Sequence, residues 1–463
     1  MTDYSGKHIT VMGLGRFGGG IGVTRWLVSR GADVLVTDLE PANDLADSVA
    51  KIQDLIDAGS VTLRLGEHNV SDFTTCDLVV ANAAVPKPWD NRFLRAAEAG
   101  GIPITTEIVL MLENLPTSVQ AQTVAVTGSV GKSTTVSMIH HALETVGKPQ
   151  DRRAFLGGNI GGSLLGRGHE IGERDWLVLE LSSAQLYWID RVLGKTGGWS
   201  PRVGVVTNIA NNHTDWHGSY EHYCSSKMKL VEAVDAPGSV LLGESVWDWR
   251  SASHAKSIRA DAVPFDRVLA IPGAHNRVNA SAALAAIRAL APDLAAEDIA
   301  CAIAAFPGLA HRLQLVVETK LPARGGEPVR FYNDSKSTTP ESALKAIEAV
   351  ASVPGCERGR IHLIAGGYDK GSDLSPIAHA AAELAGVYAI GDTGPRIAQA
   401  AGGEHSRAFE CGTLQSAVAC ALERLKPGDA LLLSPGCASW DQYDNYEQRG
   451  DEFVRLVKEA VRG

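Results

Sequence analysis

The sequence predicts an α/β protein of three domains that are built on mostly parallel sheets. The chain has 463 residues, about three times the length of a typical domain. Apolar runs of strand length alternate with stretches of helical spacing along the whole chain, as in strand–helix–strand units. Two of these runs end in glycine-rich turns. We expect the domains to span residues 1–106, 107–308 and 309–463.

The composition narrows the class of protein. The net charge is −10, from 43 basic and 53 acidic side chains, and no block of Lys and Arg occurs, which argues against a nucleic-acid partner. The seven cysteines include no C-x-x-C pair, which favours a reducing compartment and argues against a structural zinc site. The start of the chain lacks the apolar core of a signal peptide, and no run of 18 apolar residues occurs. We therefore expect a cytoplasmic protein without a membrane partner.

The first region begins with a strand, HITVMGLG, and a second strand, DVLVTD, ends at Asp38. Residues 76–84 and 101–107 are expected to be further strands. The turn Gly13–Gly18 fits the pattern G-x-G-x-x-G, and Asp38 lies twenty residues after it. This is the fingerprint of a dinucleotide site, in which backbone N–H groups approach a diphosphate. On this motif alone, an NAD-dependent dehydrogenase and a tight turn without a ligand are both open.

A second glycine-rich turn, Thr127–Thr134, follows the apolar run TVAV and precedes a helical stretch. It departs from the strict Walker pattern, because Val126 stands where that pattern has glycine. Its backbone amides can still cradle phosphates, Lys132 can pair with them, and the Ser133 hydroxyl can reach Mg²⁺. A dehydrogenase has no use for such a loop, so ATP is the expected nucleotide.

Polar residues end the next two apolar strands. The strand 176–181 contains Glu180, whose burial requires a cation or hydrogen-bond donors, and Mg²⁺ is the obvious cation beside a phosphate loop. A hydrogen-bonded structural glutamate is the alternative. After the strand 203–209, His213 and His217 lie close in sequence, and they indicate either a metal cluster or histidines that are merely hydrogen-bonded.

The rest of the chain continues the α/β pattern. An Ala-rich segment, residues 280–305, contains two helical patterns that are separated by Pro292. The third region has apolar strands with helical stretches between them, at residues 329–335, 360–367, 386–391 and 430–436.

Seven motifs follow one another in an order that resembles the Mur ligase family of peptidoglycan synthesis. They are TGSVGKST, LELSS, NNHTDWHGS, Tyr223-x-x-x-Lys227, GAHNRVNA, Gly308-x-x-His311-Arg312 and NDSKST. The resemblance covers nearly the whole chain. Three more runs, GGYDK, SPGCASWDQY and NYEQRG, are similar to the D-glutamate-adding members of the family. The resemblance implies a ligase that uses ATP to activate an acid as its acyl phosphate and then joins it to an amino acid.

The resemblance also implies an ATP site and two Mg²⁺ sites. The ATP-binding residues would be Gly128, Ser129, Val130, Gly131, Lys132, Ser133, Thr134, Asn276, Asn279, Arg312 and Asp334. The Mg²⁺ ligands would be Ser133, Glu180, His213 and Lys227, the last as a carbamate, which offers an anionic oxygen in place of a cation. Without the resemblance, Lys227 is an ordinary exposed helix lysine. Catalysis would depend on Lys132, His213, Lys227 and Arg312.

Two substrates follow from the same resemblance. UDP-N-acetylmuramoyl-L-alanine would be held by Gly15, Arg16, Phe17, Asp38, Asn82, Asn159 and His213, so that the first glycine turn binds uridine diphosphate rather than NAD. D-Glutamate would be held by Lys336, Thr338, Lys370, Ser439 and Tyr446. The expected architecture is a Rossmann-like UDP-binding domain, a central P-loop ATPase domain and a Rossmann-like C-terminal domain, in a monomer.

The sequence departs from the family pattern at several positions. Val130 replaces an Asn inside the P-loop, Asn82-Ala83-Ala84 stands in place of Ser-Pro-Gly, and Leu39-Glu40 stands in place of Thr-Arg. Trp440 and Tyr446 replace residues that are more often Leu and Phe. Three alternatives to a D-glutamate ligase stay open: a Mur-type ligase for L-glutamate or another amino acid, a nucleotide-binding subunit without turnover, and a dehydrogenase.

Overall fold

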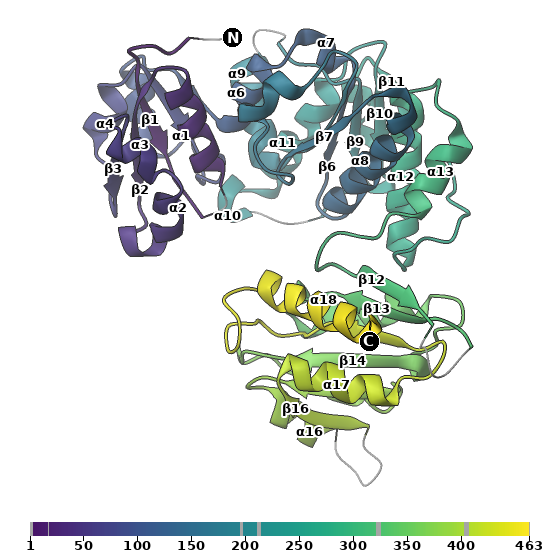
Figure 1. Ribbon diagram of the computed structural model, residues 1–463. Helices are drawn as coiled ribbons and strands as arrows, with labels where there is room; N and C mark the ends of the chain where they lie inside the picture. The colour runs from purple at the N-terminus through teal and green to yellow at the C-terminus, as the bar shows by residue number, and fades with distance from the viewer. Residues whose placement is uncertain are drawn as a thin grey trace. The chain divides into compact units, whose positions relative to one another are not determined.

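The chain forms two compact units, which together contain three sheets: two in the first unit and one in the second (Figure 1). The computed structural model describes residues 3–16, 18–194, 198–210, 214–320, 326–401 and 407–462. The first unit contains Met1–Phe265 and Val278–Ile303, and the second contains Asp266–Arg277 and Ala304–Gly463. Among the described residues, no helix has both the length and the apolar character needed to cross a membrane.

The first sheet of unit 1 has the strand order β3-β2-β1-β4-β5, and all its pairings are parallel. Its strands are β1 (His8–Met12), β2 (Asp33–Asp38), β3 (Val61–Leu65), β4 (Leu78–Ala81) and β5 (Ile104–Thr105). Its helices are α1 (Gly19–Ser29), α2 (Ala46–Ala50), α3 (Gln53–Asp57), α4 (Val70–Thr74), α5 (Arg92–Ala99) and α6 (Glu107–Asn114). Chain order reverses at β1, so the glycine turn after it lies where parallel sheets usually bind ligands. The strand expected at 101–107 is shorter than predicted.

The second sheet of unit 1 has the order β11-β10-β9-β6-β8-β7 and is also parallel throughout. Its strands are β6 (Thr123–Thr127), β7 (Ala154–Gly158), β8 (Trp176–Glu180), β9 (Val203–Val206), β10 (Ser239–Leu242) and β11 (Lys256–Arg259). Its helices are α7 (Thr117–Gln120), α8 (Lys132–Gly147), α9 (Ser183–Leu193), α10 (Thr214–His217), α11 (Tyr220–Glu232), α12 (Ala274–Leu290) and α13 (Ala296–Ala304). The first residues of α12, 274–277, and the last residue of α13, Ala304, belong to unit 2. Since β6 lies between β8 and β9, the loops that follow these three strands meet at one edge. The break expected at Pro292 separates α12 from α13.

Unit 2 contains a sheet of order β12-β13-β17-β14-β15-β16, in which only β12 is antiparallel to its neighbour. Its strands are β12 (Gln314–Thr319), β13 (Val329–Asn333), β14 (Ile361–Gly366), β15 (Gly386–Ile390), β16 (Ala408–Gly412) and β17 (Ala430–Leu433). Its helices are α14 (Pro340–Ala351), α15 (Ser375–Ala380), α16 (Gly394–Ala400), α17 (Leu414–Arg424) and α18 (Tyr446–Arg462).

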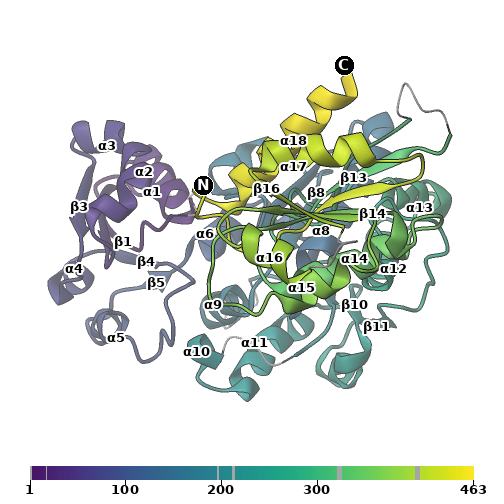
Figure 2. The ribbon, with the colours of Figure 1, turned by 90° about the horizontal axis from the view of Figure 1, so that it is seen from below.

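Helices cover both faces of this third sheet. Figure 2 shows α17 and α18 on one face and α14, α15 and α16 on the other. Alternate residues of a strand enter different cores, as the pleat requires: Tyr332 packs with α14 and α15, whereas Phe331 packs with α17 and α18. The sheet is therefore buried on both faces, and only its edges and strand ends are open for a site.

Candidate active site

The turn between β6 and α8 has the geometry of a phosphate-binding loop. Gly128 and Gly131 adopt φ values of 144° and 85°, which side chains rarely tolerate. A Cβ at Gly128 would lie 2.0 Å from Thr207 Oγ1, and one at Gly131 would lie 2.6 Å from Asn279 Oδ1. The helix α8 begins at Lys132, so its N-terminal amides follow the loop directly. Asn279, one of the residues predicted to bind ATP, thus packs against the loop.

The residues that follow β9 support this loop. Val130 N–H donates to Asn208 Oδ1 over 3.0 Å, and Asn208 Nδ2 donates to the Val130 carbonyl over 2.9 Å. Thr207 Oγ1 donates to the same carbonyl over 2.7 Å, and Ser129 N–H donates to the Asn208 carbonyl over 3.0 Å. The Val130 side chain itself is exposed, so its departure from the family pattern leaves the loop anchored. Asn208 is not among the residues predicted from the sequence, although it lies just after the apolar strand β9.

Two lysines lie near the loop. Lys132 Nζ donates to the Ser129 carbonyl over 3.1 Å. Lys227 on α11 is buried, donates to Thr127 Oγ1 over 3.3 Å, and lies 4.8 Å from the centre of the Tyr223 ring. Burial and the positive charge of Lys132 lower the pKa of Lys227 to about 7. The alternative of an exposed helix lysine is therefore wrong. A neutral amine is the form that can react with CO₂.

Glu180 at the end of β8 is buried and only half satisfied. Its Oε1 accepts a hydrogen bond from Asn159 Nδ2 over 2.9 Å, whereas its Oε2 has no hydrogen-bond partner among the described residues. A buried carboxylate oxygen without a donor is costly unless a cation neutralises it, so the residue fits a Mg²⁺ ligand. The described residues contain no group of three His, Cys, Asp or Glu side chains that could hold a metal. The predicted further ligands are Ser133, a modified Lys227 and His213, and His213 lies outside the described residues.

Of the two histidines that follow β9 in the sequence, the structure describes only His217. His213 lies outside the described residues, as does Phe17. His217 is buried, its Nδ1 lies 2.8 Å from His222 Nδ1, and its Nε2 lies 2.9 Å from Ser183 Oγ. The structure thus supports the hydrogen-bonded interpretation for His217.

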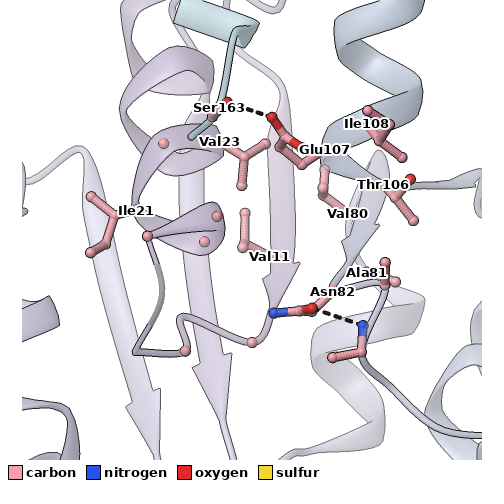
Figure 3. Close-up of a pocket in the computed structure, with 18 of the residues that line it drawn as sticks. Val11, Ile21, Val23, Val80, Ala81, Asn82, Thr106, Glu107, Ile108 and Ser163 are labelled. Carbon is pink, nitrogen blue, oxygen red and sulfur yellow. Dashed lines mark hydrogen bonds between the residues drawn. The ribbon is translucent and has the colours of Figure 1, made fainter. Parts of the chain in front are cut away.

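A cavity of about 630 Å³ lies beside the glycine turn that follows β1. Figure 3 shows its apolar wall, which contains Val11, Val23, Val80 and Ile108. Four of the residues predicted to bind the nucleotide sugar line the same cavity: Gly15, Arg16, Asn82 and Asn159. Because Asn159 follows β7 of the second sheet, the two sheets of unit 1 share this cavity.

Asp38 and Arg16 shape the turn itself. Gly15 N–H donates to Asp38 Oδ2 over 3.0 Å, so Asp38 holds the glycine turn in place. Arg16 Nε donates to Glu40 Oε2 over 2.8 Å, and its Nη2 lies 3.6 Å from Asp44 Oδ2. The Glu40 that departs from the family pattern is therefore a partner of Arg16.

Glu107, at the start of α6, points into the same cavity and accepts a hydrogen bond from Ser163 Oγ (Figure 3). Burial raises the pKa of this carboxyl group. Thr106 beside it has a buried hydroxyl without a partner among the described residues. In the sequence Glu107 marks only the predicted domain boundary, because a Glu in the first turn of a helix is common and gives no functional signal.

In unit 2, Asp334 follows β13 and holds two neighbouring loops. Leu313 N–H donates to its Oδ1 over 3.0 Å, and Ser434 Oγ donates to its Oδ2 over 2.8 Å. Burial raises the pKa of Asp334 to about 6. Asp334 thereby fixes the backbone next to Arg312. Asn276 also belongs to unit 2, where its Nδ2 donates to the Pro272 carbonyl over 2.7 Å.

The five residues predicted to bind glutamate follow three neighbouring strands of unit 2. Lys336 and Thr338 follow β13, Lys370 follows β14, Ser439 follows β17, and Tyr446 begins α18. The three loops are joined, because Gly436 N–H donates to the Ser337 carbonyl over 2.9 Å and Tyr368 N–H donates to the Ala438 carbonyl over 3.0 Å. Lys336 Nζ lies 5.4 Å from the Tyr446 ring, and Lys370 Nζ lies 4.4 Å from the Trp440 ring. The structure therefore brings these residues to one edge of the sheet.

Comparison with known proteins agrees with this geometry. Residues 126–266 match the Mur ligase middle domain, and residues 311–437 match the Mur ligase, glutamate ligase domain. The chain is 33% identical to the UDP-N-acetylmuramoylalanine–D-glutamate ligase of Pelotomaculum thermopropionicum, over the whole of both chains. It is 34% identical to the enzyme of that name from Acidobacterium capsulatum, over 98% of this chain and 97% of the relative. The chain belongs to the Mur ligase family. It is therefore an ATP-dependent ligase, and the dehydrogenase alternative is rejected.

Solved Mur ligases share the fold. The UDP-N-acetylmuramate-alanine ligase of Thermotoga maritima superposes with a TM-score of 0.54 at 19% identity, over 98% of this chain and all of the other. The MurF ligase of Thermotoga maritima, solved in complex with ADP, superposes with a TM-score of 0.53 at 15% identity, over 99% and 96% of the two chains. The predicted multi-domain α/β fold is thereby confirmed. Mur ligases use ATP and Mg²⁺, in agreement with the phosphate loop and with Glu180.

Proposed function

We propose that this Mur ligase joins D-glutamate to UDP-N-acetylmuramoyl-L-alanine in the cytoplasm, as a monomer, with ATP converted to ADP and phosphate. The observation that carries the proposal is the phosphate loop, which lies near a half-satisfied Glu180 and a buried Lys227 in a unit that also holds a large cavity at a dinucleotide-type turn. The full-length relatives that carry the name of this reaction support the choice of substrates.

The first step is activation of the acid. The carboxylate of the alanyl group attacks the γ-phosphoryl group of ATP, and an acyl phosphate and ADP form. The ammonium group of Lys132 offsets the negative charge that spreads over the transferring phosphoryl oxygens. Mg²⁺, when bound at two sites, supplies further positive charge, and Ser133, Glu180, His213 and a carbamate of Lys227 would hold it. Asn276, Asn279, Arg312 and Asp334 complete the proposed ATP site.

The second step forms the amide. The amine of D-glutamate attacks the carbonyl carbon of the acyl phosphate, and phosphate leaves from the tetrahedral intermediate. Lys370 and Thr338 would hold one carboxylate of the amino acid, and Ser439 with the backbone near Tyr446 would hold the other. The neighbouring Lys336 adds positive charge to the same edge. An acyl phosphate hydrolyses readily, so these loops must also exclude water from it.

The nucleotide sugar would occupy the cavity beside the first glycine turn. The turn, with Gly15 and Arg16, would bind the diphosphate, and Asn159 would lie on the muramoyl side near Glu180. Asn82 packs against Gly13 and accepts a hydrogen bond from Ala84 N–H, so the Asn82-Ala83-Ala84 departure still gives an ordered turn. In this proposal residues 1–106 form the domain that binds the nucleotide sugar, residues 107–308 the domain that binds ATP, and residues 309–463 the domain that binds the amino acid.

The test is phosphate release with ATP, Mg²⁺ and UDP-N-acetylmuramoyl-L-alanine, together with each enantiomer of glutamate. Two carboxylates and one amine fix three points on the chiral centre, and inversion leaves a buried charge or donor unpaired. We therefore expect kcat/KM to be roughly 30-fold to several thousand-fold higher for D-glutamate, as a loss of about 2–5 kcal/mol predicts. A preference for L-glutamate would overturn the proposed acceptor. Equal phosphate release without the nucleotide sugar would overturn the proposed reaction.

A further inference from the structure

One fully buried cation of unit 2 has no place in the steps described above. Arg449 lies in the first turn of α18 and is only 1% exposed. Its Nε donates to Ser335 Oγ over 3.0 Å, and its Nη2 donates to the Ser335 carbonyl over 2.9 Å. Its Nη1 donates to the Ala438 carbonyl over 3.1 Å, and its Nη2 also donates to the Cys437 carbonyl over 3.0 Å.

These four bonds join two loops. Ser335 immediately precedes Lys336 in the loop after β13, and Ala438 immediately precedes Ser439 in the loop after β17. The guanidinium plane therefore spans the gap between the two sets of residues that we expect to hold the amino acid. The third loop depends on the same atom, since the Ala438 carbonyl also accepts the hydrogen bond from Tyr368 N–H, two residues before Lys370.

The helix that carries Arg449 is itself fixed to these loops. Ser335 Oγ donates to the Tyr446 carbonyl over 2.8 Å, and Asn333 Nδ2 donates to the Gly450 carbonyl over 3.1 Å. A Cβ at Gly450 would lie 2.1 Å from His311 Nδ1, so the helix closely approaches the segment that precedes β12. The first turn of α18 is thus tied to the end of β13 and the loop after it by hydrogen bonds, so a change in the length of the Arg449 side chain would be transmitted to the loops.

Arg449 is unusual because its partners are carbonyl and hydroxyl oxygens. Among the described residues, no carboxylate lies within ion-pair distance of its guanidinium group. A buried arginine without a carboxylate costs desolvation energy that a neutral side chain would avoid. Its fork of donors can, however, hold several carbonyls at fixed separations, which the single ammonium group of Lys cannot do.

We propose that Arg449 is the positioning residue of the amino-acid site, because it sets the spacing between the loop of Lys336 and Thr338 and the loop of Ser439. The inference rests on the proposed function of these loops. Arg449 does not touch the acceptor; it acts through the backbone of its neighbours. When the spacing is wrong, one carboxylate of the acceptor still binds and the other does not reach its donors. The Michaelis constant for the amino acid should then rise, while ATP and the nucleotide sugar should bind as before.

The test compares two variants with a matched control in the full-length enzyme. Arg449→Lys keeps the charge and loses the fork, and Ser335→Ala removes only the hydroxyl between Arg449 and Tyr446. Tyr388→Phe is the control, because it removes a buried hydrogen bond of 2.8 Å to His362 within the same sheet, away from the three loops. For each protein, KM is measured separately for D-glutamate, ATP and the nucleotide sugar, together with the Tm.

We expect KM for D-glutamate to rise about tenfold in Arg449→Lys and about threefold in Ser335→Ala, with less than a twofold change in the other two constants. Tyr388→Phe should lower the Tm without any selective effect on KM. Equal changes in all three constants, or a selective effect in the control, would show that Arg449 serves stability alone. If Arg449→Lys does not fold, Ser335→Ala decides the question. If the parent enzyme uses another amino acid, the proposed acceptor fails, and the same KM comparison for that amino acid still tests Arg449.

Discussion

The buried charges of the two units differ in how completely the protein satisfies them. Among the described residues of unit 1, Glu180 has one carboxylate oxygen without a hydrogen-bond partner, and Lys227 donates one hydrogen bond, of 3.3 Å, to Thr127 Oγ1. In unit 2, Arg449 makes four hydrogen bonds to backbone and hydroxyl oxygens. A buried charge without partners is retained only where another interaction offsets its desolvation free energy, and a bound ligand can provide that interaction. Glu180 and Lys227 therefore indicate a site for substrate and metal, whereas Arg449 indicates a structural role in holding loops together.

The largest effect should come from the charge nearest the transferring phosphoryl group. Lys132→Ala should lower kcat/KM by about a thousandfold, because the variant loses a cation in a site where water cannot replace it. The Tm should change little, since Lys132 is only partly buried at the start of α8 and its Nζ donates to the Ser129 carbonyl within the same loop. Phosphate release and thermal unfolding, measured on the same sample, check both statements. Near-normal turnover would contradict the assignment of the phosphate loop.

A smaller loss is expected at Lys227, and it should be partly reversible. Lys227→Ala should lower activity by about a hundredfold, and formate or acetate should restore part of it by occupying the place of the proposed carbamate. A normal rate in the variant would rule out a role for Lys227, and a dead variant that no carboxylate rescues would remove the support for the carbamate.

The pH dependence of the parent enzyme sharpens the same point. Because the pKa of Lys227 is lowered to about 7, the Lys227 amine is neutral in about half of the molecules at pH 7. An ordinary lysine is almost wholly charged at that pH. Carbamate formation needs the neutral amine, so activity should rise with pH through about 7 and respond to added bicarbonate.

Lys227 should also make the folding stability depend on pH, in the direction opposite to that of a salt-bridged lysine. The folded state pays the full cost of the buried charge below pH 7, and this cost falls as pH rises toward the unfolded pKa of about 10.4.

The sequence predicted those parts of the site that depend on local backbone geometry. The turns Gly13–Gly18 and Gly128–Gly131 were recognisable because their glycines, spacing and flanking strands occur together in sequence. The three strands that bring Lys336, Lys370 and Ser439 together were visible as apolar runs, although their neighbour relations were not. Asn208 gave a signal only by its place after a strand, and its contact with Val130, 78 residues away, depends on the strand order. Arg449 could not be predicted, because only the strand order brings it into contact with Ser335, 114 residues away.

The smallest effect expected is that of Glu180→Gln on stability, and its contrast with Arg449→Met tests the comparison between the units most directly. Glu180→Gln removes a charge whose second oxygen has no partner among the described residues, and the amide oxygen can still accept from Asn159 Nδ2. The lost attraction to Lys227 and the avoided desolvation act in opposite directions, so the free energy of unfolding should change by no more than about 1 kcal/mol. Arg449→Met leaves several buried oxygens without donors and should cost about 3–5 kcal/mol. Denaturant unfolding of the two variants measures both changes, provided that their m-values are equal.

If Glu180→Gln is as destabilising as Arg449→Met, Glu180 is a structural residue like Arg449. The distinction between a ligand site in unit 1 and a structural arginine in unit 2 then fails. If Glu180→Gln is stable and inactive, the protein keeps Glu180 for the reaction rather than for the fold.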